Sequence, residues 1–216
     1  MARVRAERRE VAESRERILA AAEVFFASEG IDASLHRLAE EAGVGVATLF
    51  RRFPHRDDLI RALYDRSVAR VDELAARIQR DEAPGWDRLV AHAYGAVELV
   101  FAIPVLPAVM KRMAEIDPDY RPGDRWIEPL VRDVAHAQSD GIVRPDATGY
   151  DFAAIPLAAG GIAHLTDPVR RLIGARLVTI MLDGLRAPGA TPLPELADLT
   201  VESYHRGVHG LSATEG

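Results

Sequence analysis

The sequence predicts an all-α protein, and three observations carry this prediction. Apolar residues from Ile60 to Ile78 recur at spacings of three and four, which is the period of an α-helix. Two shorter helical patterns meet at Gly43, and further helical patterns between proline-rich breaks follow from residue 86. No alternation of apolar and polar residues is long enough to indicate a β-strand. With 216 residues and 48% hydrophobic content, the chain can bury the core of one large or two small domains.

The two short patterns span residues 34 to 53. Ser34 is placed to cap the first helix by accepting a hydrogen bond from a backbone N–H group, and Gly43 ends it, because glycine tolerates a positive φ. The second helix should bury Leu49, Phe50 and Phe53. It should turn outward a face made of Val46, Ala47, Thr48, Arg51 and Arg52. Two short helices hinged at a glycine, with arginines on the second, predict a helix-turn-helix, which places one helix in the major groove of DNA.

The outward residues of the second helix are the candidates for contact with DNA. Val46 and Ala47 are short enough to meet a thymine methyl group, and Thr48 can do the same or bind a phosphate. Arg52 is the candidate for a guanine, whereas Arg51 and Arg56 are expected to hold phosphates. Each arginine could instead be a solvated surface charge. The predicted DNA-binding residues are Ser34, His36, Val46, Ala47, Thr48, Phe50, Arg51, Arg52 and Arg56.

Charge is distributed unevenly along the chain, whose net charge is -6. Residues 1–56 carry ten arginines against nine Asp and Glu residues, a balance of +1, and the remainder carries 17 basic against 24 acidic residues. The acidic average therefore does not exclude a DNA-binding segment. At the N-terminus, a flexible arm that enters a minor groove and an exposed helix of ion pairs are both open interpretations. The residues concerned are Arg3, Arg5, Arg8 and Arg9, interleaved with Glu7, Glu10 and Glu13.

A long connecting helix is predicted over residues 57–80. Asp57 and Asp58 lie in its first turn, where the helix dipole favours anions, and Pro84-Gly85 follows its end. Because this helix begins at the DNA-binding module and runs into the next domain, a tilt at its far end would move the recognition helix. This helix is the simplest route in the chain by which a change in the larger domain could be coupled to the recognition helix.

The region from residue 86 to residue 147 contains helical patterns over 86–103, 105–116 and 126–139. Bulky and adaptable apolar side chains are concentrated here, as they are in the linings of small-molecule pockets. For each of these residues taken alone, an ordinary core is the favoured interpretation. The candidates for an effector cavity are Trp86, Tyr94, Phe101, Met110, Met113 and Trp126.

Two further helices are predicted over residues 149–187, joined at Asp167-Pro168. The first contains Ala158-Ala159-Gly160-Gly161, small residues that allow another helix to approach closely. The second carries an apolar seam wide enough to pack on two sides. The helices either belong to an intramolecular core or form a four-helix bundle between two subunits, and a DNA-binding module favours the dimer. The predicted dimer residues are Ala159, Gly160, Ile173, Leu177, Ile180, Met181 and Gly184.

Residues 15–64 resemble the TetR family of bacterial one-component transcription regulators. The resemblance rests on an ordered series of short motifs: Phe25-Phe26 through Gly30-Ile31, Ala42-Gly43-Val44, Thr48-Leu49-Phe50, Phe53-Pro54 and Arg56. It implies a dimeric regulator with a ligand cavity and a dimerisation bundle in its larger domain. The chain departs from the family pattern at Gly45, where a Ser is usual, at Phe50, where a Tyr is usual, and at Arg52, where a His is common. These departures put the operator sequence in doubt.

Several other classes of protein find little support in the sequence. The histidines show no HExxH motif, the chain has no cysteine, and neither a nucleophile-elbow nor a phosphate-loop signature occurs, so we expect no enzyme, no metal and no cofactor. The apolar stretches fall short of a membrane span, and the charged N-terminus lacks the apolar region of a secretory signal. We therefore expect a cytoplasmic protein without a membrane partner.

The resulting expectation is a ligand-responsive regulator, a repressor that binds a palindromic operator in double-stranded DNA as a homodimer and is released by a small, largely apolar effector. Its expected domains are an arm and helix-turn-helix over 1–56, a connecting helix over 57–80, and an effector-binding and dimerisation domain over 81–187. A tail with one weak helix follows over 188–216. The alternative is a helical dimeric scaffold or small-molecule-binding protein without DNA binding, which leaves the Gly43 turn and the arginine-bearing helix unexplained.

Overall fold

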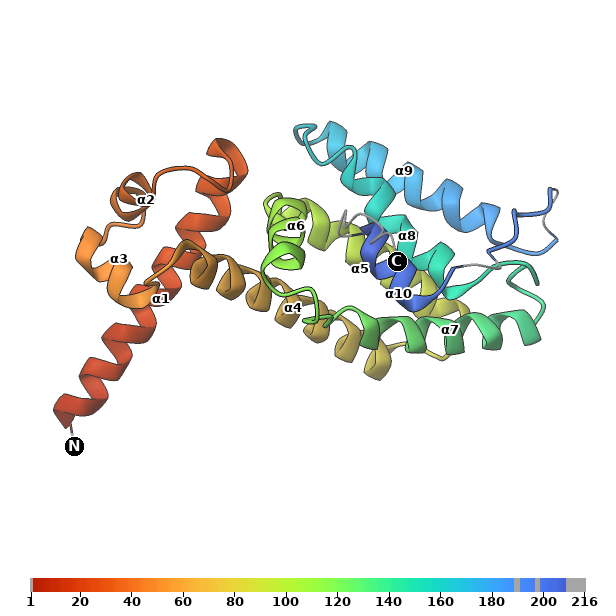
Figure 1. The fold of residues 1–216 in the computed structure, drawn as a ribbon. Helices are drawn as coiled ribbons and strands as arrows, with labels where there is room; N and C mark the ends of the chain where they lie inside the picture. Colours follow the sequence, from red (N-terminus) through yellow and green to blue (C-terminus); the bar gives the residue numbers. More distant parts are fainter. Residues whose placement is uncertain (1, 189–190, 197–198, 209–216) are drawn as a thin grey trace, which may run out of the picture. The chain divides into compact units, whose positions relative to one another are not determined.

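The computed structural model describes residues 2–188, 191–196 and 199–208, and these residues form an all-α fold (Figure 1). Between the helices, one isolated antiparallel bridge joins Val143 to Arg186. The helices are α1 (Ala2–Glu29), α2 (Leu35–Glu41), α3 (Val46–Arg52), α4 (Arg56–Asp81), α5 (Trp86–Ala102), α6 (Leu106–Ile116), α7 (Asp124–Ser139), α8 (Gly149–Gly160), α9 (Val169–Gly184) and α10 (Val201–Val208).

The predicted helical class is confirmed, and the helix ends lie close to those that the sequence predicts. Helix α4 differs from the predicted connecting helix by one residue at each end, and α5 and α6 begin and end within one residue of their predicted bounds. None of the described helices is by itself long and apolar enough to cross a membrane, although α5 and α6 together meet the length and composition criterion as a bent pair.

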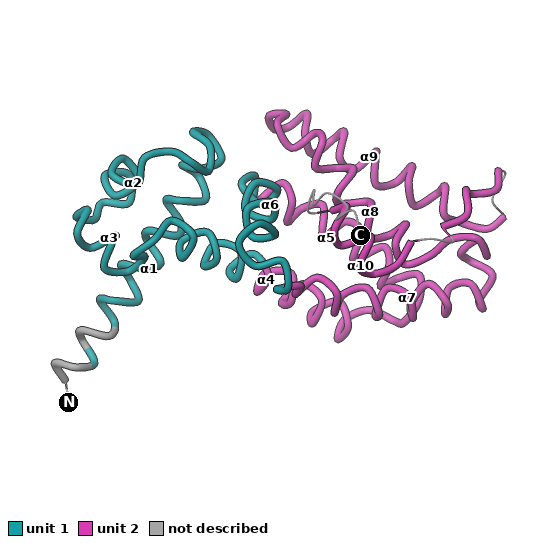
Figure 2. Tube along the Cα trace, in the orientation of Figure 1, with its two compact units in different colours: residues 1–67, 103–120 teal, residues 68–102, 121–216 magenta. Residues whose placement is uncertain are grey.

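The chain forms two compact units, which Figure 2 distinguishes by colour. The first consists of residues 1–67 and 103–120, and the second of residues 68–102 and 121–216. Helix α4 therefore passes from the first unit into the second without a break. Helix α6 belongs to the first unit, although it lies far beyond the helix-turn-helix in the sequence.

The core of the first unit is formed where α1, α2, α3 and the start of α4 meet. Ile18 and Phe26 of α1, Leu38 of α2 and Leu59 of α4 are almost completely buried. The N-terminal turns of α1 extend past α2 and α3 in Figure 1. There Arg9 Nε lies 2.7 Å from Glu13 Oε1, a contact of the kind expected for an ion-pair helix. The side chains of Arg3, Glu7 and Arg8 lie outside the described residues, and the arm in a minor groove stays a prediction.

Helix α6 is fixed to the first half of α4 by polar contacts. Arg112 donates to both carboxylate oxygens of Asp57, at 3.0 and 3.3 Å, and Arg61 Nη2 lies 2.8 Å from Asp117 Oδ2. Tyr120 packs edge-on against Tyr64, with ring centroids 5.8 Å apart. The acidic first turn of α4 is thus satisfied by an arginine of α6 as well as by the helix dipole.

The core of the second unit is formed by α5, α7, α8 and α9. Along α5, residues at helical spacing are buried, beginning with Leu89 and Ala93 and ending with Phe101. Phe152 and Ile155 of α8 and Val178 of α9 complete this core without measurable exposure. The α9 glycine Gly174 lies so close to the Phe101 ring that an added Cβ would be only 2.7 Å from it. The absence of a Cβ at this position therefore allows the ring to be buried.

Candidate nucleic-acid interface

The turn between α2 and α3 is closed by backbone hydrogen bonds around Gly43. Gly43 has a φ of 61°, its N–H donates to Glu40 O at 3.0 Å, and the N–H of Val44 donates to Ala39 O at 3.0 Å. This is the Schellman arrangement, in which a left-handed glycine ends a helix and satisfies its last carbonyls. It sets the direction in which the chain enters α3.

Helix α3 is anchored by its apolar side. Leu49 is completely buried and Phe53, directly after the helix, is 1% exposed. The guanidinium of Arg15, from α1, lies 4.8 Å from the centre of the Phe53 ring. With this side held against the unit, the opposite side of α3 faces solvent.

The solvent-facing side of α3 carries Ala47, Phe50 and Arg51, and His36 of α2 lies next to it. Phe50 is 38% exposed, so the prediction that it is buried is wrong; its ring packs edge-on against His36, with centroids 6.1 Å apart. Arg51 is exposed and donates from Nη2 to Thr48 Oγ1 at 3.2 Å. We call His36, Ala47, Phe50 and Arg51 the recognition surface.

Arg52 does not lie on the recognition surface. Its Nε donates to Ser14 Oγ of α1 at 3.1 Å, and its side chain is partly buried. Ser14 itself is 4% exposed and also donates to Val11 O at 2.9 Å. In this structure Arg52 therefore fixes α3 to α1, and the expected outward orientation of its side chain is not observed. Ser14 could not be identified from the sequence, since nothing in its neighbourhood indicates a partner 38 residues away.

Arg56 also has an internal role. Its Nη1 donates to Ile31 O at 2.6 Å and its Nη2 to Ala33 O at 2.8 Å, and its guanidinium lies 5.9 Å from the centre of the Phe26 ring. These contacts use two of its donor nitrogens on the loop between α1 and α2. The geometry revises the expectation that Arg56 is directed at a phosphate.

The remaining predicted DNA-binding residues surround the start of each short helix. Ser34 is the residue before α2 and is exposed, but its hydroxyl makes no capping hydrogen bond, contrary to the prediction. Val46 and Thr48 are half-buried on α3. They flank Ala47 in the sequence, and their contact with DNA stays a prediction.

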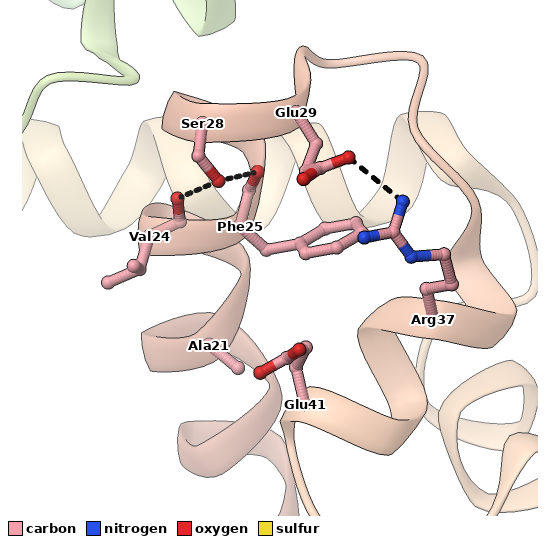
Figure 3. A pocket seen from close by; sticks show the side chains of 7 residues that line it. All are labelled: Ala21, Val24, Phe25, Ser28, Glu29, Arg37 and Glu41. Atoms are coloured by element: carbon pink, nitrogen blue, oxygen red, sulfur yellow. Dashed lines mark hydrogen bonds and ion pairs between the residues drawn. The ribbon is translucent and has the colours of Figure 1, made fainter.

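A pocket of about 210 Å³ lies between α1 and α2 and is separate from the recognition surface (Figure 3). Figure 3 shows Arg37 of α2 reaching across it, with Nη1 2.9 Å from Glu29 Oε2 and the guanidinium 5.4 Å from the centre of the Phe25 ring. These contacts join the two helices. No residue predicted to contact DNA lines this pocket.

The predicted effector residues are divided between the two units, and a cavity lined by them stays a prediction. Met110 and Met113 lie on α6 in the first unit, whereas the other four lie in the second.

The four residues in the second unit have partners of their own. Phe101 is buried in the core of the second unit, and the guanidinium of Arg186 lies 4.6 Å from the centre of the Trp86 ring. Tyr94 pairs with the Thr179 hydroxyl, at 2.8 Å, and the Trp126 indole donates to Asp72 at 3.0 Å. None of the six lines the pocket between α1 and α2 or a second, polar pocket formed by α4, α5 and α7.

The predicted dimer residues divide into two groups. Ile173 and Ile180 of α9 are 43% and 63% exposed, and Gly184 is exposed as well. Leu177 and Met181 are partly buried against the core of their own unit.

The predicted dimer residues of α8 pack inside their own unit. Ala159 is completely buried, and a Cβ on Gly160 would lie 3.7 Å from Val100, so both serve the packing of α8 on α5. Two further exposed residues of α9, Val169 and Leu172, continue the same stripe but are absent from the predicted set. Leu157 of α8 is also exposed.

Among the residues that the structure describes, no group of three His, Cys, Asp or Glu side chains is placed to hold a metal ion. The arrangement instead presents an aromatic ring, an imidazole and a guanidinium on one short helix and its neighbour. These groups can contact base edges and phosphates, and they define the chain as a helix-turn-helix protein.

Comparison with known proteins agrees with this class. The model of the bacterial regulatory proteins of the tetR family matches residues 18–63. The TetR transcriptional regulator SCO0520 from Streptomyces coelicolor is 33% identical, over 81% of this chain and 99% of that one, with a TM-score of 0.56. None of the curated proteins matches the chain. The chain belongs to the TetR family of bacterial transcription regulators.

More distant structures share the fold. The ketosteroid transcriptional regulator KstR2 of Mycobacterium tuberculosis is 18% identical, over 80% of this chain and 94% of that one, with a TM-score of 0.64. AibR, solved with isovaleryl coenzyme A and operator DNA, is 19% identical, over 80% of this chain and 97% of that one, with a TM-score of 0.66.

Proposed function

We propose that this regulator is a repressor that binds a palindromic operator as a homodimer and is released by a small-molecule effector. The observation that carries the proposal is the recognition surface. Phe50 and Arg51 are exposed on a helix whose other side is fully anchored, and His36 is packed against Phe50. Exposed aromatic and arginine side chains on the second helix of a helix-turn-helix are placed to contact base edges.

Within this proposal, Arg51 replaces Arg52 as the residue that reads a base. Arg51 has one contact with a side chain of its own helix, to Thr48, and its guanidinium is otherwise exposed. Arg52 would have to give up its hydrogen bond to Ser14 first. Arg52 and Arg56 serve instead to hold α3 and the neighbouring loop in position.

Dimerisation is supported by the exposed apolar stripe on α9. Leu172 and Ile180 are 64% and 63% exposed, and Val169 and Ile173 lie on the same side. Large apolar side chains grouped in this way favour contact with another surface. A second copy of the same stripe, related by twofold symmetry, is the occupant that a palindromic operator requires.

Ligand response is supported by the continuity of α4 and by the fold relative AibR, which was solved with both a coenzyme A thioester and operator DNA. An effector acts only through a difference in its affinity for two states. Moving the protein from mostly DNA-bound to mostly free takes about 5.5 kcal/mol of such preference. A ligand that binds both states equally would leave the operator occupied.

Selection of binding sites from a pool of random DNA duplexes tests the proposed function. The full-length protein should enrich a palindrome whose half-sites lie about one helical turn apart. Enrichment of a single asymmetric site would contradict the dimer. The absence of any enrichment at low salt would contradict DNA recognition itself and favour the scaffold.

A further inference from the structure

A polar pocket of about 250 Å³ lies in the second unit, where α4 ends, α5 begins and α7 passes. It contains none of the aromatic and methionine residues that the sequence suggests for an effector. Its lining residues are Gln79, Pro84, Arg88, Pro129, Arg132, Asp133 and His136.

Arg88 closes the C-terminal end of α4 and also lines the pocket. Its Nε donates to Glu82 O at 3.1 Å and its Nη2 to Gln79 O at 3.0 Å, which satisfies carbonyls at the end of the helix that have no partner within it. Its Nη1 lies 3.8 Å from Asp133 Oδ1, which is too long for a hydrogen bond. Arg88 therefore has donor capacity left at the pocket.

Asp133 and Gly85 make the pocket rigid at the start of α5. Asp133 Oδ1 accepts a hydrogen bond from the backbone N–H of Gly85 at 3.0 Å. Gly85 has a φ of 91°, and a Cβ added there would lie 3.4 Å from the Cβ of His136. The turn before α5 is thus held from both sides, and Pro84 and Pro129 add stiff apolar walls.

The charges that line the pocket favour an anion. Arg88 and Arg132 are cationic and Asp133 is anionic, which leaves one positive charge when His136 is neutral. Arg132 and His136 are exposed, and in the described part of the chain their side chains make no ion pair or hydrogen bond. An acid group with two or more oxygens can accept from Arg88 Nη1 through one oxygen and from Arg132 through another, and both are charge-assisted hydrogen bonds.

We propose that this pocket binds the terminal acid group of a small molecule, a phosphate or a carboxylate, and that this anion is the effector of the proposed repressor. The effector role rests on the proposed function. An anion that accepts from Arg88 Nη1 binds the same guanidinium that closes the end of α4 through Nε and Nη2. Because α4 continues into the first unit, a shift of this guanidinium towards the anion changes the end of the helix that leads to α3.

Calorimetric titration of the full-length protein at pH 7.5 in a low-chloride buffer tests the site, with inorganic phosphate and succinate as separate probes. We expect saturable binding of at least one probe, about tenfold or more weaker in Arg132→Ala, because a charge-assisted contact is lost. Arg77→Ala is the matched control, since Arg77 is exposed on α4 and does not line the pocket. It should bind as the wild type does.

The two probes separate the two acid groups. Binding of phosphate alone identifies a phosphoryl ligand, and binding of succinate alone identifies a carboxylate; either result supports the site. Failure of both probes to saturate, or equal binding by the wild type and Arg132→Ala, overturns it.

Operator binding by the same proteins separates this proposal from the proposed function. Without an anion, Arg132→Ala should bind the selected duplex as the wild type does, and the anion should weaken operator binding by the wild type only. Anion binding that depends on Arg132 but leaves operator affinity unchanged would overturn the effector role. Anion binding by a protein that recognises no DNA would contradict the repressor and leave the site intact.

Discussion

Arg56 joins three parts of the first unit through one side chain. It begins α4, donates to two carbonyls of the loop after α1 and lies over the Phe26 ring. Replacing it with alanine leaves both carbonyls without their charged donor. Hydrogen bonds to charged groups contribute about 1.5 to 3 kcal/mol.

We therefore predict that Arg56→Ala lowers the free energy of unfolding by about 1.5 to 3 kcal/mol, measured by urea denaturation. Arg77→Ala, at an exposed position on the same helix, should change it by less than about 0.5 kcal/mol. Unchanged stability in Arg56→Ala together with weaker binding to all DNA sequences would instead restore the phosphate contact that the sequence suggests.

His92, on α5, gives the second unit a predicted dependence on pH. Burial lowers the pKa of His92 to about 4, against the opposing effect of the Asp133 charge. The unfolded chain, with a histidine pKa near 6.5, takes up a proton first as the pH falls. Stability contributed by neutral His92 is therefore complete above about pH 6.5 and is lost as the pH falls from 6.5 towards 4.

Thermal or urea unfolding between pH 7 and pH 4 should show this loss, at most about 3 kcal/mol from the size of the shift. His92→Gln removes the titrating group and should flatten this part of the profile. A wild-type profile that is the same as that of His92→Gln would show that the imidazole does not remain neutral in the folded protein.

The internal partners of Arg52 and Arg56 could not be predicted from the sequence. Helical periodicity assigns a residue to a face of its own helix, but it does not say what packs against that face. Ser14 and the carbonyls of Ile31 and Ala33 are brought there by the packing of α1 on α3 and α4. The exposure of Ala47 and Arg51, by contrast, follows from the burial of Leu49 on α3 and of Phe53 directly after it, and this prediction is confirmed.

At the scale of elements, the turn between α2 and α3 depends on one backbone conformation. Gly43 has a φ of 61°, and a Cβ added there would meet nothing within 4 Å, so the cost of a substitution comes from the backbone alone. Gly43→Ala should destabilise the protein by about 1 to 2 kcal/mol. Gly43→Asn should cost less, since asparagine adopts this conformation more readily.

Chemical denaturation of these variants can be compared with that of Gly207→Ala. Gly207 lies in α10 with open space around it and without a positive φ, so alanine should not destabilise that helix. Equal stability of Gly43→Ala and the wild type would mean that the turn rearranges at no cost.

The sequence located the helices well because proline, glycine and apolar spacing mark their ends locally. It did not indicate that α6 associates with the first unit. That association depends on Arg112 with Asp57 and on Arg61 with Asp117, pairs that lie 55 and 56 residues apart. The polar pocket could not be predicted for a related reason. Its lining combines one residue of α4, one of the turn after it, one of α5 and four of α7 rather than one aromatic-rich segment.

At the scale of the whole molecule, recognition of a palindromic operator requires two copies of the chain. Glutamates at Leu172 and Ile180, the two most exposed residues of the α9 stripe, would place charge in the proposed interface. We predict that this double variant is monomeric in light scattering at concentrations where the wild type is dimeric. Leu196→Glu, at an exposed leucine outside α8 and α9, is the control and should remain dimeric. A dimer that survives both glutamates would show that another surface joins the subunits.

The most direct test of the account is to repeat the selection from random duplexes with Arg51→Ala beside the wild type and the Arg77→Ala control. Loss of one base contact costs about 1 to 3 kcal/mol of binding free energy and relaxes the base preference at one position of the operator. If a twofold-symmetric pair of recognition surfaces reads the operator through Arg51, one position in each half-site should lose its preference while Arg77→Ala reproduces the wild-type palindrome. An Arg51→Ala palindrome identical to that of the wild type would contradict the assignment.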